Sequence, residues 1–223
     1  MPEFDRHSDR YLETLQQAIA FSGDQASYFA DYKAVKLTEI MDKNVFNKVL
    51  DFGCGIGSVS VAIQTTAPTW QINGFDISRD SLARVPSSLT EKGIFTSNIE
   101  DLGSDHDAVL LTGVMHHINP EERRSALDLA LGRLKPGGLL VVFEHNPWNP
   151  VTSWVVDRCP FDEHAILLPP PEIVSIFQTI GLVNIKRQFI IFFPNITKFL
   201  RPLERWLTWC PLGAQYVIVG EKA

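Results

Sequence analysis

The sequence has little of what marks secreted or membrane-spanning proteins. It holds three cysteines, Cys54, Cys159 and Cys210, which lie far apart and form no Cys-x-x-Cys pair, so no disulfide framework is expected. No apolar run approaches the ~18 residues that a membrane-spanning helix needs. The charged first residues lack the apolar stretch of a secretory signal. We therefore expect a cytoplasmic protein with reduced thiols.

The chain also lacks an excess of positive charge. Its 26 acidic and 20 basic residues give a formal net charge of −6. Proteins that bind the phosphate backbone usually present a basic surface, so we expect no nucleic-acid partner. The length of 223 residues suits one α/β domain with additions better than two full domains.

Apolar periodicity predicts an alternation of strands and helices. Two helices are predicted before the first strand, over 8–20 and 24–41. The predicted strands are 48–52, 70–75, 93–97, 107–112, 138–143 and two closing segments, "VNIKRQFIIFF" and "AQYVIVGEK". The helices predicted between them are 57–66, 78–85, 120–134 and 171–180. Strands that alternate with helices indicate a parallel sheet with helices on both faces.

Three glycines at alternate positions follow the first predicted strand, in "VLDFGCGIGSVS" (residues 49–60). Glycines in such a turn let the backbone approach a ligand closely, and the following helix offers unpaired N–H groups. Asp76 ends the next strand at the offset from which a carboxylate binds both hydroxyls of a ribose. The stretch therefore predicts a site for a nucleoside cofactor.

The glycine spacing distinguishes this site from a dinucleotide site. Dinucleotide sites have G-x-G-x-x-G, whereas the third glycine here is Gly57 and Ser60 takes the later position. Asp51 precedes the turn, where a carboxylate would repel a pyrophosphate but suits a cationic amino-acid moiety. These features favour S-adenosylmethionine and disfavour the alternative of a nicotinamide-dependent oxidoreductase.

Four segments resemble the motifs of the class I S-adenosylmethionine-dependent methyltransferases of small molecules. "VLDFGCGIG" resembles the family's first motif, "GFDIS" its second-strand acidic site, "DHDAVLLTGVMHHI" its fourth-strand motif and "LKPGGLLVVFEHN" the lead-in to its fifth strand. The resemblance implies an α/β fold with a Rossmann-like, mostly parallel seven-stranded sheet and an antiparallel last strand. We expect an N-terminal helical cap over 1–44, a cofactor-binding core over 45–145 and a C-terminal part of the same domain over 146–223.

The resemblance implies S-adenosylmethionine as cofactor, with S-adenosylhomocysteine as product. Asp51 would lie near the methionine amino group, and Asp76 would hold the ribose hydroxyls. Asn98 stands where relatives often have the Asp that accepts from the adenine amino group, and an Asn carbonyl accepts there only if the amide is suitably oriented. The implied cofactor-binding residues are Asp51, Gly53, Cys54, Gly55, Gly57, Asp76, Ile77, Asn98, Ile99, Thr112 and Gly113.

Histidines follow the fourth and fifth predicted strands, whose carboxyl ends border the ligand site in such sheets. His116, His117 and His145 are candidate general bases, which a hydroxyl or protonated amine acceptor would need. Alternatively, one histidine of the "HH" pair packs beneath the cofactor in a structural role. No metal is predicted, because no ligand spacing is typical of one. The alternative metal set is His145, Asp162, Glu163 and His164.

Two inserted segments, 146–171 and 194–212, are expected to bind the acceptor. Both are rich in Trp, Phe and Leu, which predicts a partly apolar small molecule, aromatic or lipid-linked. The loop "CPFDEHA" either lines the acceptor pocket or forms a capped turn. A helix predicted over 198–209 has three interpretations: a lid, a face packed on the core, or a peripheral membrane contact. The predicted acceptor-binding residues are Tyr28, Tyr32, Trp148, Trp154, His164 and Trp206.

The sequence thus predicts an enzyme that methylates an oxygen or nitrogen of a small molecule. Two alternatives stay open. A non-catalytic partner subunit would bind S-adenosylmethionine without turnover, and an enzyme of the same fold would use the sulfonium for chemistry other than methyl transfer. A homodimer is also open.

Overall fold

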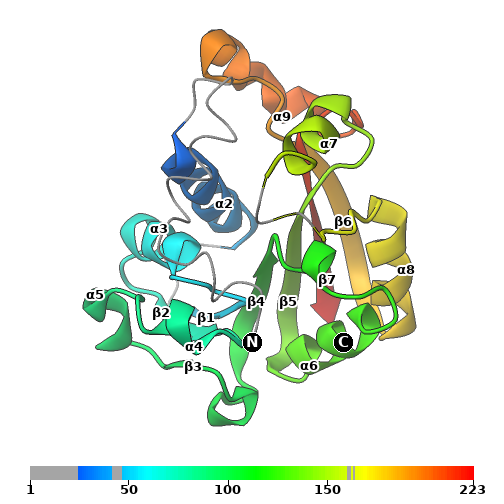
Figure 1. The fold of residues 1–223 in the computed structure, drawn as a ribbon. Coiled ribbons are helices and arrows are strands. Elements are labelled where there is room, and N and C mark those ends of the chain that lie inside the picture. The colour runs from blue at the N-terminus through cyan, green and yellow to red at the C-terminus, as the bar shows by residue number, and fades with distance from the viewer. Residues whose placement is uncertain (1–24, 42–46, 160–161, 163) are drawn as a thin grey trace.

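The computed structural model describes residues 25–41, 47–159, 162 and 164–223, which form one seven-stranded sheet flanked by helices (Figure 1). The strand order is β3-β2-β1-β4-β5-β7-β6. All neighbouring strands are parallel except that β7 runs antiparallel to both β5 and β6. The strands are β1 Lys48–Phe52, β2 Gln71–Phe75, β3 Phe95–Thr96, β4 His106–Thr112, β5 Leu134–His145, β6 Leu182–Ile190 and β7 Gln215–Lys222.

Helices connect the strands. The α-helices are α2 Ala26–Ile40, α3 Ser58–Thr66, α4 Arg79–Leu82, α5 Ser87–Thr90, α6 Arg123–Leu131, α7 Pro150–Val156, α8 Pro170–Thr179 and α9 Glu204–Leu207. The 3-10 helices are η4 Ile99–Asp101, η5 Met115–His117 and η7 Asn195–Leu203. In the described part of the chain, none of the helices has the length and apolar content that crossing a bilayer requires.

Alternate residues of the central strands are buried against helices on opposite faces of the sheet. On one face, Leu50 belongs to an apolar cluster with Leu127 of α6 and Phe177 of α8. On the other face, its neighbour Val49 belongs to a cluster with Ile63 of α3 and the apolar side of α2. Because successive side chains of a strand point to opposite faces, a strand buried on both faces is apolar at most positions; the exceptions here include Asp51 of β1 and Asn73 of β2, which are also buried. This arrangement confirms the predicted fold class.

Several elements differ from their predicted extents, and the helix predicted over 8–20 lies outside the described residues. The strand predicted over 93–97 is reduced to the two residues of β3. β5 begins at Leu134, where it already pairs with β4, so the helix predicted over 120–134 ends earlier, at Leu131. The helix predicted over 198–209 is instead η7 followed by the short α9. Pro202 has no N–H to donate there, and Thr197 has non-helical dihedral angles.

Candidate cofactor and acceptor site

The glycine turn joins β1 to α3 at the carboxyl edge of the sheet. Gly53, Gly55 and Gly57 have φ of 81°, 54° and 82°, a region that residues with a Cβ seldom adopt. A Cβ on Gly53 would lie 2.5 Å from Val114 Cγ2, so packing requires glycine there. A Cβ on Gly55 would meet no other described atom within 4 Å. Gly55 therefore borders open space at the end of β1.

Asp51 presents a buried, incompletely satisfied carboxylate beside this turn. It is 0% exposed, and Ser60 Oγ donates to its Oδ2 at 2.7 Å. Its Oδ1 has no hydrogen-bond partner among the described residues. Burial raises the pKa of Asp51 to about 6, and Asp76 adds to that increase, although Ser60 and Lys33 oppose it. A buried acceptor without a partner is costly, so the site suits a ligand that brings a positive charge and N–H groups.

Asp76 follows β2 and faces the same turn. Its Oδ2 accepts from the backbone N–H of Gly55 at 2.7 Å, and its Oδ1 accepts from Ser78 N at 2.8 Å. Each carboxylate oxygen has a second lone pair, so the side chain can still accept from ribose hydroxyls. Ile77, beside it, is 66% exposed. Cys54 is buried, and burial raises the pKa of its thiol, so it is no thiolate nucleophile.

Asn98 stabilises the start of η4. Its Oδ1 accepts from Glu100 N at 3.3 Å, and its Nδ2 donates to Asp101 Oδ1 at 3.0 Å. The carbonyl oxygen that would accept from an adenine amino group is therefore already shared with the backbone, though it keeps one lone pair. Ile99 follows as the first residue of η4 and is partly buried. The adenine roles of both residues stay predictions.

Glu144 connects the segments that follow β4 and β5. Thr112 ends β4, and Gly113, with φ of 68°, turns the chain and donates its N–H to Phe143 O at 2.9 Å. Glu144 is buried at the end of β5, where its Oε1 accepts from Met115 N at 2.7 Å. This carboxylate therefore holds η5 against β5.

His116 lies between two carboxylates. Its Nδ1 is 2.6 Å from Glu144 Oε2, and its Nε2 is 3.3 Å from Asp162 Oδ1. Burial lowers the pKa of His116, but the two carboxylates outweigh it and raise the value to about 9. Burial alone would raise the pKa of each carboxylate, yet the histidines hold both values at about 2. His116, Glu144 and Asp162 therefore form an ion-paired cluster, called the histidine cluster below.

The other two histidines flank this cluster. The rings of His117 and His145 lie 4.1 Å and 5.1 Å from that of His116, measured between centroids. Burial, reinforced by the charge on His116, lowers the pKa of each to about 4. Both are therefore neutral near pH 7, as a general base must be. The structure brings the three predicted histidines together, and their catalytic roles stay predictions.

Lys33 of α2 is a member of the site that sequence reasoning did not single out. Burial lowers the pKa of its amine, and Glu144 and Asp51 oppose that change. The Lys33 amine is therefore close enough to interact electrostatically with Asp51, beside the glycine turn, and with Glu144, beside the three histidines. The available signal in the sequence was its position next to Ala34 on the inward side of α2, where a lysine is unusual.

The two tyrosines predicted to bind acceptor lie on α2 and contact the segment η7–α9. Tyr32 Oη donates to Glu204 Oε2 at 3.4 Å, and the Arg201 guanidinium lies 4.0 Å from the Tyr28 ring centroid. Glu204 Oε1 also accepts from the backbone N–H groups of Phe192 and Phe193. The tyrosines therefore hold η7–α9 against α2, and their acceptor role stays a prediction.

The remaining predicted acceptor residues lie on the surface. Trp148, Trp154 and Trp206 are each about half exposed, and His164 is exposed. The rings of Trp154 and Trp206 are covered by Arg158 and Arg205, at 4.4 Å and 4.1 Å from the ring centroids. None of these four predicted residues lines the pocket described next.

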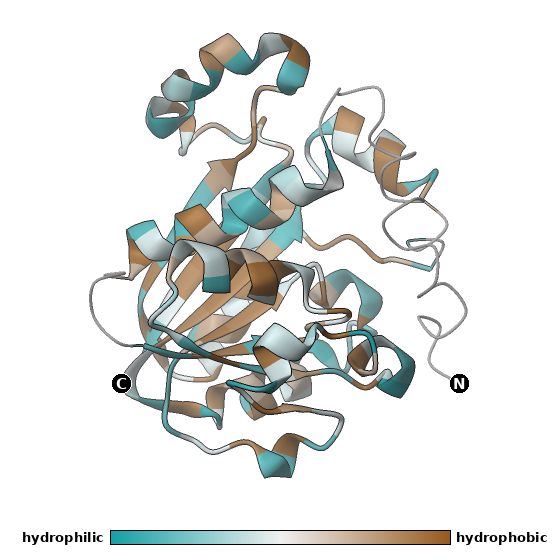
Figure 2. Ribbon diagram, turned by 90° about the vertical axis from the view of Figure 1, so that its left-hand side faces the viewer, coloured by the Kyte–Doolittle hydropathy of each residue, from teal (hydrophilic) through white to brown (hydrophobic). Residues whose placement is uncertain are grey.

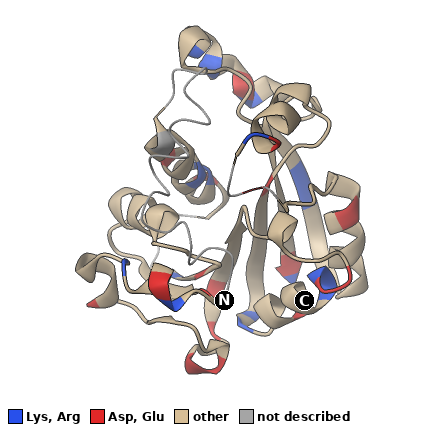
Figure 3. Cartoon of the chain, viewed as in Figure 1, with Lys and Arg blue, Asp and Glu red and all other residues tan. Residues whose placement is uncertain are grey.

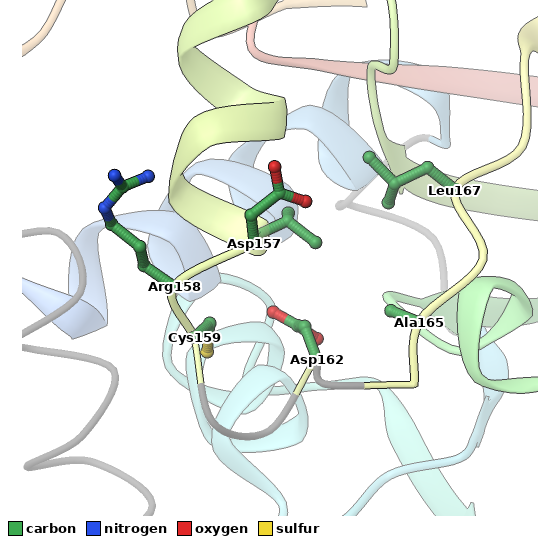
Figure 4. Close-up of a pocket in the computed structure, with 7 residues that line it drawn as sticks. Asp157, Arg158, Cys159, Asp162, Ala165 and Leu167 are labelled. Carbon is green, nitrogen blue, oxygen red and sulfur yellow. The ribbon is translucent and has the colours of Figure 1, made fainter.

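A pocket of about 550 Å³ has in its lining Asp162 (Figure 4), the residue that contacts His116. The loop after α7 forms most of it, with Asp162 lying between Cys159 and Ala165 (Figure 4). Because Asp162 also contacts His116 and His117, the pocket and the cluster share a wall. Its lining residues are Val156, Asp157, Arg158, Cys159, Asp162, Ala165 and Leu167.

Known sequences match the core of the chain. Residues 49–138 match the model of a family described as a methyltransferase domain. Carboxy-S-adenosyl-L-methionine synthase of Chromohalobacter salexigens is 27% identical over 121 residues, which are 49% of this chain and 45% of that protein. The enzyme of the same name from Colwellia psychrerythraea is 30% identical over 112 residues, 46% of this chain and 44% of that protein. The chain therefore spans about half the length of the curated relatives it matches.

Solved structures match nearly the whole chain. A methyltransferase from Archaeoglobus fulgidus, described as dependent on S-adenosylmethionine, has a TM-score of 0.68 at 17% identity, covering 89% of this chain and 95% of its own. Magnesium protoporphyrin IX methyltransferase of Synechocystis, solved with bound S-adenosylhomocysteine, has a TM-score of 0.69 at 16% identity, covering 99% and 96%. At these identities the likeness establishes the fold alone.

Proposed function

We propose that this chain methylates an oxygen or nitrogen of a small, partly apolar molecule, using S-adenosylmethionine. The match of residues 49–138 to a family described as a methyltransferase domain supports this proposal, as does the order of the strands in the sheet. The observation that carries the cofactor assignment is the orphan Oδ1 of Asp51 beside the open space at Gly55. The ammonium group of the cofactor's methionine part supplies the charge and the N–H donors that this oxygen lacks. The neighbour solved with S-adenosylhomocysteine supports the same cofactor.

In this proposal the chain's own residues bind and orient the cofactor, which supplies an electrophilic methyl group on sulfur. Asp76 accepts hydrogen bonds from the ribose hydroxyls. Ile77 covers one face of the adenine with its exposed side chain. Asn98 and Ile99 border the adenine edge.

The acceptor would lie between the pocket and the histidine cluster. Methyl transfer is an in-line displacement, so the protein's main task is to align the acceptor atom with the methyl group. His117 and His145 are neutral near pH 7, because burial and His116 lower their pKa values to about 4. Either one can take the proton that a hydroxyl acceptor loses, whereas His116 is held by Glu144.

We further propose that the acceptor is lipid-linked and is met at a membrane surface. The segment η7–α9 and the following turn project from the body of the protein (Figure 2) and expose large apolar side chains. Basic residues lie on the same segment (Figure 3), a combination that suits the anionic boundary of a bilayer. The exposed apolar residues are Ile196, Phe199, Leu203, Trp206, Trp209 and Leu212. Sedimentation with anionic vesicles, lost when Phe199 and Trp209 become serine, tests this proposal.

The methyltransferase proposal is tested first by calorimetric titration with S-adenosylhomocysteine, with NADH as the control ligand. Binding of the first alone supports the cofactor assignment. Acceptor candidates, starting with phenols and lipid-linked sugars, are then incubated with S-adenosylmethionine and weighed by mass spectrometry. A product heavier than its acceptor by one methylene unit supports methyl transfer. Binding of NADH alone, or of neither ligand, contradicts the proposal.

A second candidate function follows from the curated relatives, which are named carboxy-S-adenosyl-L-methionine synthases. In that case S-adenosylmethionine is itself the substrate, and a carboxyl donor replaces the methyl acceptor. The same mass measurement separates the two candidates. Carboxylation makes the S-adenosylmethionine heavier by one CO₂, whereas methyl transfer converts it to S-adenosylhomocysteine.

A further inference from the structure

Three ligand-type atoms converge on one point at the wall of the pocket. Asp162 Oδ1 lies 3.3 Å from His116 Nε2 and 3.5 Å from His117 Nε2. All three ligand atoms lie within 4.8 Å of one another. The histidines come from η5, after β4, whereas Asp162 comes from the loop after α7. The fold therefore assembles two imidazole nitrogens and a carboxylate oxygen from two separate segments.

We propose that His116, His117 and Asp162 bind a divalent transition-metal ion, with Zn²⁺ as the best match. A tetrahedral zinc ion has ligand bonds of about 2.0–2.2 Å, which places neighbouring ligand atoms about 3.4 Å apart. The two distances to Asp162 Oδ1, 3.3 Å and 3.5 Å, bracket that spacing. An octahedral Mg²⁺ site, with bonds of about 2.0–2.1 Å at right angles, would bring the ligand atoms to about 3 Å and favours oxygen ligands.

His116 also has the hydrogen-bond partner that a metal-ligating histidine needs, because its second ring nitrogen, Nδ1, contacts the carboxylate of Glu144. A ligating histidine generally donates a hydrogen bond from the N–H of its second ring nitrogen, often to a carboxylate, which fixes the ring and makes the ligating nitrogen more basic. His116 Nδ1 is 2.6 Å from Glu144 Oε2, and Glu144 is in turn held by Met115 N. The chain therefore directs His116 Nε2 toward Asp162.

A shared proton explains this geometry less well than a metal ion does. A hydrogen bond between an imidazolium and a carboxylate is typically about 2.7–2.9 Å long. The contact between His116 and Glu144, at 2.6 Å, is at least as short as such a bond, whereas the two contacts to Asp162, at 3.3 Å and 3.5 Å, are longer. The longer distances agree better with the spacing of two ligand atoms around a zinc ion.

The location of the proposed ion also suggests a role in the reaction. This role rests on the methyltransferase proposal. Asp162 forms part of the pocket wall (Figure 4), so an ion on Asp162 would lie at the edge of the pocket. Three protein ligands leave a tetrahedral ion one open position, as in catalytic zinc sites. A hydroxyl acceptor bound at that position would lose its proton more readily, and His145 would then be the base, because His117 is a ligand of the ion. The site therefore favours an oxygen acceptor over a nitrogen acceptor.

Metal binding is tested without an assay of activity. The full chain is stripped with a chelator, and ZnCl₂, CoCl₂ and MgCl₂ are titrated separately by calorimetry. We expect one Zn²⁺ per chain and, with Co²⁺, the intense visible absorption of a tetrahedral complex. Wild-type protein that binds no stoichiometric Zn²⁺, or that binds Mg²⁺ more tightly than Zn²⁺, overturns the proposal.

Matched variants locate the ion. Asp162→Asn and His117→Gln should each weaken Zn²⁺ binding more than tenfold, and Glu144→Gln should weaken it about 10–100-fold as a positioning residue. Asp157→Asn removes an exposed carboxylate from the same pocket and should leave Zn²⁺ affinity unchanged. Unchanged affinity in both Asp162→Asn and His117→Gln overturns the site.

A separate titration with S-adenosylhomocysteine serves as the folding control for each variant. It also separates the two proposals. Protein that binds S-adenosylhomocysteine but no Zn²⁺ overturns the metal site alone. Protein that binds Zn²⁺ at these residues but no S-adenosylhomocysteine supports the metal site and contradicts the methyltransferase proposal.

Discussion

Replacing Asp51 with asparagine should stabilise the ligand-free protein at neutral pH and at the same time weaken its binding of S-adenosylhomocysteine. Burial raises the pKa of Asp51 from 3.8 to about 6, so keeping the charged form buried costs on the order of 3 kcal/mol above that pH. Asparagine keeps an acceptor for Ser60 but puts two unpaired amide N–H groups in place of Oδ1, at a cost of about 2 kcal/mol. The net gain is about 1 kcal/mol, or an increase of about 2–4 °C in melting temperature.

The pH dependence of stability shows why Asp51→Asn should be more stable than wild type and not less stable. Between the unfolded pKa of 3.8 and the folded value of about 6, the native state binds more protons than the unfolded state. Asp51 therefore makes the wild type less stable as pH rises through that window, and its contribution is constant above it. The stability difference between Asp51→Asn and wild type should be full at pH 8 and small at pH 4. Urea denaturation at the two pH values measures it.

The same substitution should reduce affinity. The charge-assisted bond between the carboxylate and the ligand's ammonium group is worth about 2 kcal/mol, so Asp51→Asn should bind S-adenosylhomocysteine about thirtyfold more weakly at pH 8. Wild-type affinity should fall as pH drops below about 6, where Asp51 takes up a proton. Asp128→Asn, an exposed change on α6, is the control. A variant that is less stable than wild type at pH 8, or that binds equally well, refutes the reasoning.

Four further substitutions test other parts of the structure. Asp76→Ala should weaken binding of S-adenosylhomocysteine by about 1–3 kcal/mol in calorimetry. If this variant binds as tightly as wild type, Asp76 does not bind the ribose hydroxyls. Gly55→Ala should cost only about 1 kcal/mol of stability but reduce that affinity more than tenfold, whereas Gly53→Ala should mainly lower the melting temperature, because its Cβ would strike a side chain. Arg123→Met should cost about 3 kcal/mol in urea denaturation, because it breaks the pair with Glu172 and leaves backbone carbonyls without partners; a loss below 1 kcal/mol would show that these bonds contribute little.

The parts of the site that depend on short-range sequence were predictable. The glycine turn and Asp76 lie at the ends of two neighbouring parallel strands, and such strands end at a common edge. Contacts between distant segments were not predictable in this way. His116 and Asp162 meet only because the loop after α7 returns to η5, and Ile166 N donates to His116 O there. Nothing in the spacing of either segment specifies that return.

The helix predicted over 198–209 shows a different kind of error. Large apolar residues do recur at helical spacing in that segment, and Phe199, Leu203 and Trp206 among them are exposed. Periodicity nevertheless says nothing about backbone hydrogen bonds, and Pro202 removes a donor in the middle of the segment. The same side-chain pattern is therefore carried by the tighter turns of η7. Pro202, inside the periodic segment, is the residue of the sequence that indicates this interruption of the helix.

In our proposal the site has two halves, one for the cofactor and one for the acceptor. The cofactor half is built within residues 49–138, the span that matches the methyltransferase family. The acceptor half draws on the loop after α7 and on η7–α9, which follow that span in the chain. A fold can keep one half and exchange the other, because function is set by the site and not by the scaffold. We therefore expect the chemistry at Asp51 to be shared with those relatives, and we expect the segments after residue 138, Asp162 among them, to determine the acceptor of this chain.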